Sequence, residues 1–216
     1  MCGMDAREYW ERVYEEKSEN AVSWYRPHLE TSLDWIEELA GGRDATIIDA
    51  GGGTSTLVDD LLARGYTRLT VLDIAPAALE KARKRLGRAA EQVRWVAGDI
   101  RRIELAESSC DLWHDRAMFH FLCGSDDRRA YVRQVKRAMK PDGVVIIGTF
   151  GAAGPRKCSS LDVARYEPAG LASELGPGFQ LLNSAIELHR TPLGVEQQFV
   201  YCAFRAARHR QQPANQ

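Results

Sequence analysis

The chain changes from strand to turn to helix within Thr46-Ile47-Ile48-Asp49-Ala50-Gly51-Gly52-Gly53-Thr54-Ser55-Thr56-Leu57. Apolar, β-branched residues run into three glycines, and Leu57, Leu61 and Leu62 follow at helical spacing, a pattern that predicts strand, tight turn and helix. Glycines can take positive φ and let a ligand lie against the backbone, and the free N–H groups of the new helix face that ligand. The stretch therefore indicates a nucleoside site, although a glycine cluster alone fits an ordinary βα turn equally well.

Acidic residues stand at the ends of the next strand patterns. Arg68–Asp73 ends in an acid 20 positions beyond Gly53, where an αβ fold brings a carboxylate to ribose hydroxyls. Further strands are expected over Val93–Ile100, from Cys110 to Asp115, and over Val144–Phe150 after the turn Pro141-Asp142-Gly143. Helices are expected near Thr54–Arg64, Pro76–Leu86 and Ser125–Met139. This alternation predicts a parallel sheet with helices on both faces and a ligand site at the carboxyl ends of the strands.

Together these motifs resemble the class I S-adenosylmethionine-dependent methyltransferases over about residues 45–150. The segment Asp49–Gly53 looks like their first motif, Asp73 like their ribose-binding acid, Asp99-Ile100 like their adenine-binding pair, and Lys140–Gly143 like their turn before the fifth strand. The resemblance implies S-adenosyl-L-methionine as cofactor. It also implies these cofactor-binding residues: Trp24, Asp49, Gly51, Gly52, Gly53, Ser55, Asp73, Ile74, Gly98, Asp99, Ile100, Asp115 and Arg116.

One position departs from the family pattern acid-x-Gly-x-Gly-x-Gly, because Ser55 occupies the place of the third glycine. Its hydroxyl can cap the helix that follows. The Rossmann dehydrogenase pattern fits worse, since its third glycine falls on Thr56, where close helix–strand packing needs Gly or Ala. An NAD-dependent oxidoreductase therefore remains an alternative.

The C-terminal third closes the sheet differently. Phe179–Arg190 and Val195–Arg205 are strand-like and are joined by the turn Thr191-Pro192-Leu193-Gly194. A final antiparallel hairpin resembles the methyltransferase sheet, so we expect an α/β, Rossmann-like, doubly wound and mostly parallel seven-stranded sheet with a C-terminal antiparallel hairpin. The expected organisation is a helical lid over residues 1–44, which the resemblance suggests, a methyltransferase domain over 45–207, and a disordered tail over 208–216.

Composition limits the partners and the compartment. The 216 residues are 44% hydrophobic with a formal net charge of −1, which fits one globular domain. The basic runs lie on helices that also carry acids, so no nucleic-acid partner is expected. Five cysteines without a CxxC pair argue for a reducing compartment and against a disulfide frame or structural zinc. We find no apolar run of about 18 residues and no targeting pattern. We therefore expect no membrane partner and a cytoplasmic location.

The acceptor is less well defined. The Asn/Asp-Pro-Pro-aromatic motif of amide and base N-methyltransferases is absent after the fourth strand, and Thr149-Phe150-Gly151 offers no oxygen-rich pair for magnesium, so no metal is expected. Between two phenylalanines, His120 is either a base or a packed structural residue. Trp24 or Tyr25 contacts the sulfonium or the acceptor through its aromatic face. The alternative is that the two rings only fasten a helix to the sheet. Candidate acceptor residues, if not surface loop, are Tyr25, His120, Cys158, Arg165 and Tyr166.

Two resemblances bear on the acceptor class. The segments Phe-His-Phe-Leu, Cys-Ser-Ser-Leu and His-Arg-Thr-Pro resemble small bacterial methyltransferases, some relatives of which act on thiols or chalcogen compounds. The N-terminal Tyr-Trp-x-x-x-Tyr resembles protein lysine methyltransferases. We therefore expect a small-molecule acceptor, thiol, chalcogen or similar, with a protein lysine acceptor as the alternative. A catalytically silent cofactor-binding protein is a third reading, and no catalytic residue or oligomeric state is assigned.

Overall fold

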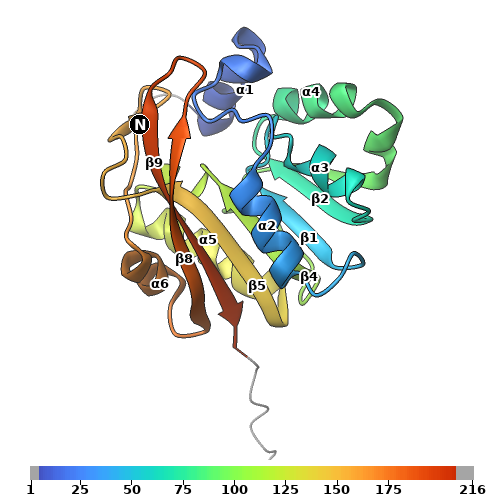
Figure 1. The fold of residues 1–216 in the computed structure, drawn as a ribbon, viewed down its shortest axis with the longest axis vertical. Helices are drawn as coiled ribbons and strands as arrows, with labels where there is room; N and C mark the ends of the chain where they lie inside the picture. Colours follow the sequence, from blue (N-terminus) through green and yellow to red (C-terminus); the bar gives the residue numbers. More distant parts are fainter. Residues whose placement is uncertain (1–4, 208–216) are drawn as a thin grey trace, which may run out of the picture.

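A computed structural model describes residues 5–207 and contains one mostly parallel sheet with helices on both faces (Figure 1). The seven strands of this sheet lie in the order β3-β2-β1-β4-β5-β9-β8. Their bounds are β1 (Thr46–Ala50), β2 (Arg68–Asp73), β3 (Val93–Ala97), β4 (Cys110–Arg116), β5 (Met139–Phe150), β8 (Phe179–Arg190) and β9 (Glu196–Ala206). The expected α/β fold class is confirmed.

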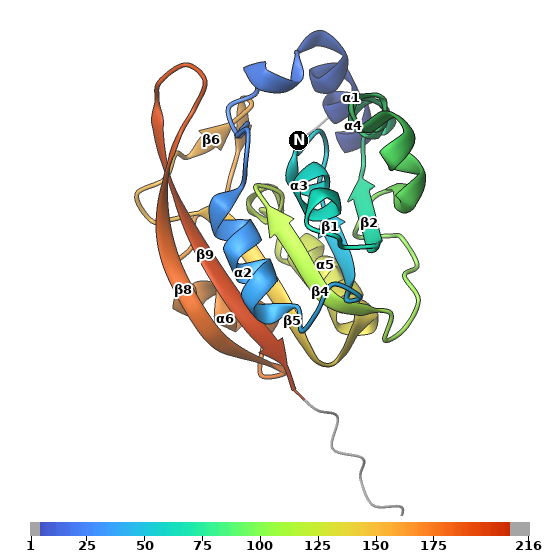
Figure 2. The same ribbon diagram turned by 45° about the vertical axis from the view of Figure 1, so that its right-hand side comes forward.

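Helices divide between the two faces according to their apolar stripes. One face is covered by α2 (Glu30–Leu39), α3 (Leu57–Ala63) and α4 (Pro76–Leu86), each of which contributes at least one buried leucine to one core cluster. The opposite face is covered by α5 (Ser125–Ala138) and α6 (Pro168–Leu175). In Figure 2, α2 lies across the middle of the sheet, and β8 and β9 form one edge. The first helix, α1 (Ala6–Glu16), packs against α4 instead of the sheet.

The strand order reverses at β1, which determines where a ligand can bind. β1 pairs in parallel with β2 on one side and with β4 on the other. In open α/β sheets the crevice outside the carboxyl ends of the strands at such a reversal is the binding position. The last hairpin runs the other way, because β9 is antiparallel to β5 and β8 is antiparallel to β9, as the sequence predicts.

Several local expectations are corrected. Helix α3 begins at Leu57 and not at Thr54, because the preceding three residues belong to the glycine turn. Two short strands were not predicted: β6 (Lys157–Cys158) pairs with β7 (Leu161–Asp162) through two serines at positive φ. Three 3-10 helices were not predicted: η1 (Glu19–Ala21), η2 (Gly87–Gln92) and η3 (Phe119–Phe121).

Two further expectations concern membranes and the tail. None of the helices within residues 5–207 has the length and apolar content required to cross a bilayer. The expected disordered tail, 208–216, lies outside the described residues.

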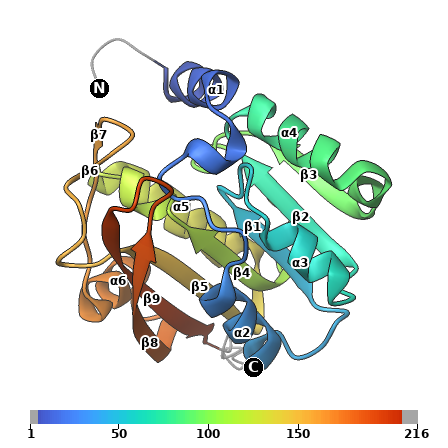
Figure 3. The same cartoon turned by 45° about the horizontal axis from the view of Figure 1, so that its top comes forward.

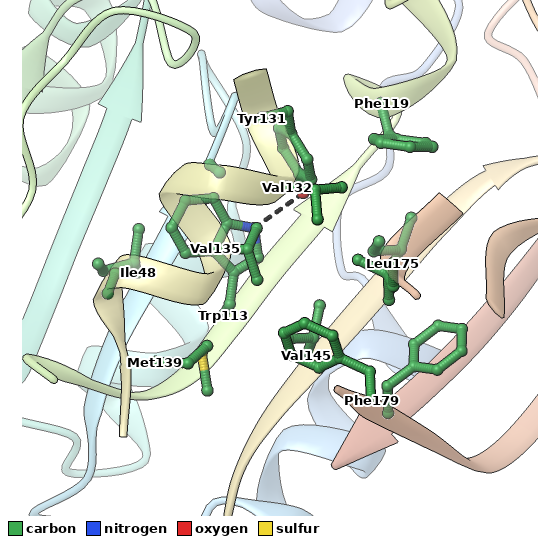
Figure 4. Close-up of a cluster of buried hydrophobic side chains, with 14 of the residues drawn as sticks. Ile48, Trp113, Phe119, Tyr131, Val132, Val135, Met139, Val145, Leu175 and Phe179 are labelled. Atoms are coloured by element: carbon green, nitrogen blue, oxygen red, sulfur yellow. Dashed lines mark hydrogen bonds between the residues drawn. The ribbon is translucent and has the colours of Figure 1, made fainter. Parts of the chain in front are cut away.

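A buried polar chain anchors the turn that follows β4. Trp113 Nε1 donates to Tyr131 Oη at 2.9 Å (Figure 4), and Tyr131 Oη donates to Asp115 Oδ2 at 2.9 Å. The other oxygen, Asp115 Oδ1, accepts from the backbone N–H groups of Met118 and Phe119 at 3.2 Å. Burial raises the pKa of Asp115 to about 6 in spite of these bonds. Because Tyr131 lies on α5, its bond shows that the Asp115 carboxylate points to the α5 face. The two bonds from Met118 N and Phe119 N fix the turn at the end of β4.

Replacing Tyr131 by Phe removes the hydroxyl that bridges this chain and leaves Trp113 Nε1 and one Asp115 oxygen without partners. An unsatisfied buried polar group costs about 1–3 kcal/mol, so we expect a loss of unfolding free energy of that size in urea titration. Tyr66→Phe is the matched control, because Tyr66 is equally buried but its hydroxyl makes a single 3.5 Å bond to Ile36 O. Equal losses in the two variants would contradict the assignment.

Candidate functional site

A cavity of about 820 Å³ opens at the carboxyl ends of β1, β2, β3 and β4. Its volume falls within the range of about 300–1,000 Å³ that is usual for ligand sites. Figure 3 shows α1 lying over this end of the sheet. The residues of the sequence prediction that line the cavity are Trp24, Tyr25, Asp49, Gly51, Gly52, Ser55, Asp73, Ile74, Gly98, Asp99, Ile100 and Arg116.

The glycine turn forms the floor beside β1 and has no room for side chains. Gly51 has φ +71°, and a Cβ there would lie 2.5 Å from Met118 Cβ. A Cβ on Gly52 would lie 2.6 Å from Asp49 Oδ2. Ser55 Oγ accepts a hydrogen bond from Leu57 N at 3.2 Å, but the N-cap residue of α3 is Thr56, whose side chain makes no capping bond. Protein packing therefore requires glycine at positions 51 and 52, and Gly51 and Gly52 line the cavity while their N–H groups donate to Leu72 O at 2.7 and 3.1 Å.

The third glycine of the turn lies under α1. Gly53 does not line the cavity, and a Cβ on it would lie 2.5 Å from Tyr14 Oη and 3.3 Å from Asp73 Oδ2. Helix α1 is held in this place from α4, since the Glu11 carboxylate accepts from Ala77 N at 3.1 Å and Lys81 Nζ donates to Tyr14 O. Tyr14 is thus a cavity residue that is not among the predicted site residues.

Asp73, at the end of β2, is a buried carboxylate without an ion-pair partner among residues 5–207. It is 6% exposed, and its Oδ1 accepts from Ala75 N at 2.9 Å. Burial raises its pKa to about 7, against the lowering effect of backbone N–H groups, and the charge of Asp49 raises it further. Such a carboxylate has unused acceptor capacity toward the cavity, which suits the hydroxyls of a ribose.

Asp99, beyond β3, is already occupied by an arginine. Its oxygens accept from Arg101 N and Nε at 2.9 Å and from Arg101 Nη2 at 2.7 Å, and Arg101 Nη1 donates to Asp127 Oδ1 at 2.8 Å. Burial raises the pKa of Asp99, but the bonds to Arg101 outweigh it and the net direction is down. Arg101 and Asp127 also line the cavity. The sequence prediction missed this pair, because charged residues two and 28 positions away carry no motif.

A second carboxylate, Asp49, is compensated by a histidine on the neighbouring strand. Asp49 and His114 are register partners on β1 and β4, and His114 Nδ1 lies 2.8 Å from Asp49 Oδ1. The other ring nitrogen, Nε2, lies 2.9 Å from Ser32 Oγ on α2. Asp49 and His114 both line the cavity and are almost fully buried.

The end of β4 separates two residues that the prediction grouped together. Arg116 lines the cavity, and it donates from Nε to Tyr201 Oη at 2.9 Å and from Nη1 to Trp24 O at 2.8 Å. Asp115 is the adjacent residue in a strand, so its side chain points to the other face, where the described bonds use both oxygens. The structure therefore does not bring Asp115 to the cavity, in contrast to the prediction.

The aromatic residues before β1 line the cavity and also pack on one another. The Trp24 ring centroid is 5.8 Å from that of Trp10 and 6.2 Å from that of Tyr14. Trp24 thus packs against α1 and lines the cavity at once, and its contact with a sulfonium or an acceptor stays a prediction. Tyr25 lines the same cavity.

The remaining acceptor candidates do not line the cavity. His120 is fully buried and stacks on Phe150 at 4.2 Å, and burial lowers its pKa to about 3. Cys158 is buried, its Sγ is 3.8 Å from Ser23 Oγ, and burial raises its pKa to about 11. Arg165 Nη1 donates to Ala152 O at 2.7 Å, and Tyr166 packs against Phe119. These four lie behind or beside the site and do not form its wall.

No cluster of three or more His, Cys, Asp or Glu side chains suited to a metal ion occurs within residues 5–207.

Comparison with known proteins agrees with this geometry. Residues 47–143 match the family model described as a methyltransferase domain. The ubiquinone/menaquinone biosynthesis C-methyltransferase UbiE of Roseobacter denitrificans is 33% identical over 96 residues, which cover 43% of this chain and 37% of that protein. Human EEF1A lysine methyltransferase 2 is 21% identical over 193 residues, covering 83% of this chain and 76% of the relative.

Two solved structures share the fold. One, from work on the conversion of a disulfide bond into a thioacetal group during echinomycin biosynthesis, has a TM-score of 0.77 at 21% identity and covers 93% of each chain. The other is the Burkholderia thailandensis 1,6-didemethyltoxoflavin-N1-methyltransferase with bound 1,6-didemethyltoxoflavin and S-adenosylhomocysteine. Its TM-score is 0.71 at 19% identity, over 96% of this chain and 93% of that one.

The order of the seven strands and the crevice at their carboxyl ends are those of the class I methyltransferase fold. The part of the chain that matches the methyltransferase domain, residues 47–143, contains the glycine turn and the acids at the ends of β1, β2 and β3.

Asp73→Asn is expected to stabilise the unliganded protein at pH 8. The pKa of the carboxyl is about 7 in the folded chain and about 3.9 when unfolded. The folded state therefore binds more protons between these values, and stability falls as pH rises through this window. The amide removes this cost, up to about 4 kcal/mol. Thermal melts should show the variant above wild type at pH 8 and level with it near pH 4; no difference at pH 8 would contradict the burial argument.

Gly51→Ala should destabilise the chain more than Gly65→Ala. Both glycines have positive φ, +71° and +84°, but an added Cβ at Gly65 meets nothing within 4 Å. The conformational cost of about 1–2 kcal/mol is common to both. Only Gly51→Ala adds the collision with Met118, about 1–3 kcal/mol. Urea unfolding of the two variants measures the difference, and equal midpoints would show that the turn has room.

Proposed function

We propose that the chain transfers a methyl group from S-adenosylmethionine to a small-molecule acceptor with a nucleophilic sulfur, chalcogen or similar atom. The observation that carries the proposal is the joint opening of the glycine turn and the unpaired Asp73 carboxylate into one cavity. In this proposal Asp73 accepts from both ribose hydroxyls, Asp99 meets the adenine amine while it shares Arg101, and Gly51 and Gly52 leave room for the amino-acid part.

The cofactor supplies an electrophilic methyl group on a sulfonium, and the chain's own residues align and desolvate the reactants. Transfer neutralises a positive centre, so exclusion of water favours it. The aromatic rings of Trp10, Trp24 and Phe121 line the cavity, and their faces attract a cation. The acceptor atom donates the electron pair of the new bond, and its proton, where it carries one, leaves to solvent or to a base. A thiol needs little help to ionise.

The N-terminal segment, residues 1–44, is proposed to act as a lid on this cavity. Its described part contributes Trp10, Tyr14 and Trp24 to the lining. Tyr9 Oη donates to Ser159 O and so joins α1 to the β6–β7 hairpin. A cover made from two sides favours a small acceptor, because a lysine side chain on a protein surface needs an open approach.

A protein lysine acceptor is the second candidate function, and the similarity to human EEF1A lysine methyltransferase 2 supports it. The catalytically silent reading differs from both in predicting binding without turnover. The dehydrogenase alternative loses its support, because the sheet closes with the antiparallel hairpin of the methyltransferases. We place the protein in the cytoplasm, where its described cysteines, all free thiols, are expected to stay reduced.

Radiolabelled methyl transfer tests the proposal. Enzyme and methyl-labelled S-adenosylmethionine are incubated with separate thiol, amine and carboxylate panels and with a cell lysate, and label is counted in small molecules and in protein. We expect label in the thiol panel, and none with Gly51→Ala as the control enzyme. Label in lysate protein alone would favour the lysine reading, and cofactor binding without any transfer would favour the silent one.

A further inference from the structure

Arg85, in the last turn of α4, has a guanidinium group whose N–H donors are all used. Its Nε donates to Asp59 Oδ1 at 3.0 Å, and its Nη2 donates to Asp59 Oδ2 and to Ser55 O, both at 2.8 Å. Its Nη1 donates to Thr54 O at 3.0 Å and to Glu19 Oε2. A guanidinium has five N–H donors in a fixed geometry, so these bonds leave none free.

The bonds of Arg85 join three parts of the chain. Thr54 and Ser55 follow the glycines of the turn and line the cavity. Asp59 lies in the first turn of α3, and Glu19, in the lid, begins η1 and also lines the cavity. Arg85 itself is not a cavity residue. It therefore holds two walls of the cavity from behind.

Other contacts dock the lid without linking a charge to the turn. Lys81 holds α1 beside α4 through backbone carbonyl groups of the lid (Figure 3). Nearer the turn, Thr56 Oγ1 donates to Arg26 O at 3.1 Å, a bond between neutral groups. The contact of Glu19 with Arg85 differs from both, because it joins two charged groups and its guanidinium also holds the turn.

The exposure of this ion pair makes it reversible. The side chains of Arg85, Glu19 and Asp59 are 24%, 28% and 30% exposed, so water screens their charges in part. Such a pair is weak when both side chains must first be ordered. Here the turn and Asp59 order the guanidinium in advance, which lowers the entropy cost of the bond to Glu19. The lid contact is therefore strongest when the turn has the form seen in the structure.

We propose that Arg85 is a positioning residue that couples closure of the lid to the ligand-binding form of the glycine turn, through Glu19. The inference rests on the proposed function, which makes residues 1–44 a lid. A cofactor that fixes the turn then favours the closed lid, and the closed lid strengthens cofactor binding by the same factor, because coupled binding equilibria are reciprocal. Arg85 exerts this effect without touching the cofactor or the acceptor.

Calorimetry and hydrogen exchange with S-adenosylhomocysteine test the coupling. Glu19→Gln keeps the size of the side chain and removes its charge, so we expect affinity to fall by about 3- to 10-fold. Amides of residues 18–25 should also lose part of the protection that the ligand gives them in wild type. Glu16→Gln is the matched control, because Glu16 is exposed and its side chain makes no hydrogen bond or ion pair with residues 5–207. This control should behave as wild type.

A double-mutant cycle separates coupling from a merely structural effect. If Glu19 acts through Arg85, then Glu19→Gln causes no further loss of affinity in an Arg85→Gln background. Independent structural losses would instead multiply. Melting curves report whether Arg85→Gln folds, and the measurement on the free protein below does not need this variant.

Hydrogen exchange of the free protein tests the same link from the other side. Glu19→Gln should speed the exchange of amides in residues 51–57, although the substituted residue lies in the lid, and Glu16→Gln should not. Wild-type affinity in Glu19→Gln, an equal loss in the Arg85→Gln background, or unchanged exchange at the turn would each overturn the coupling. Failure of the proposed function looks different: wild type would transfer no methyl group or bind no nucleoside, while exchange at the turn would still decide the role of Arg85.

Discussion

The burial of two carboxylates side by side at the ends of β1 and β2 is the constraint on which the rest of the structure depends. Asp49 and Asp73 are both nearly inaccessible to water, and burial, together with the charge of Asp49, raises the pKa of Asp73. The chain compensates Asp49 with His114 from the next strand and leaves Asp73 uncompensated. The sheet order makes this possible, since only a strand adjacent to β1 can present an imidazole in register. The cost left at Asp73 is the driving force available to hydroxyl donors of a ligand.

From Asp49 a series of polar contacts crosses the sheet to its outer hairpin. His114 reaches Ser32 at 2.9 Å, Ser32 Oγ lies 3.4 Å from Tyr201 Oη, and Tyr201 in turn holds Arg116. Because Tyr201 lies on β9, the antiparallel hairpin does more than extend the sheet. It fixes the guanidinium at the end of β4, so Asp49 and Arg116, which both line the cavity, are joined by one connected set of side chains.

Sequence reasoning succeeded where the determinants are local. The bounds of α4 and β8 match their expected ranges. Pro76 starts the helix and Gly87 ends it, and the alternation of apolar and polar residues defines the strand. It failed where tertiary contacts decide. The pairing of Arg101 with Asp127, and the position of Tyr14 over Gly53, depend on elements far apart in the chain. Adjacent strand residues such as Asp115 and Arg116 face opposite ways, and only the assembled sheet tells which one meets the cavity.

The most direct test of the central claim is a crystal structure of the complex with S-adenosylhomocysteine. The account predicts both ribose hydroxyls within about 3.2 Å of the Asp73 carboxylate, with the adenosyl sulfur beside Gly51 and the turn backbone unmoved. A nucleoside bound elsewhere, or an Asp73 carboxylate turned away from the ribose in a filled cavity, would contradict it.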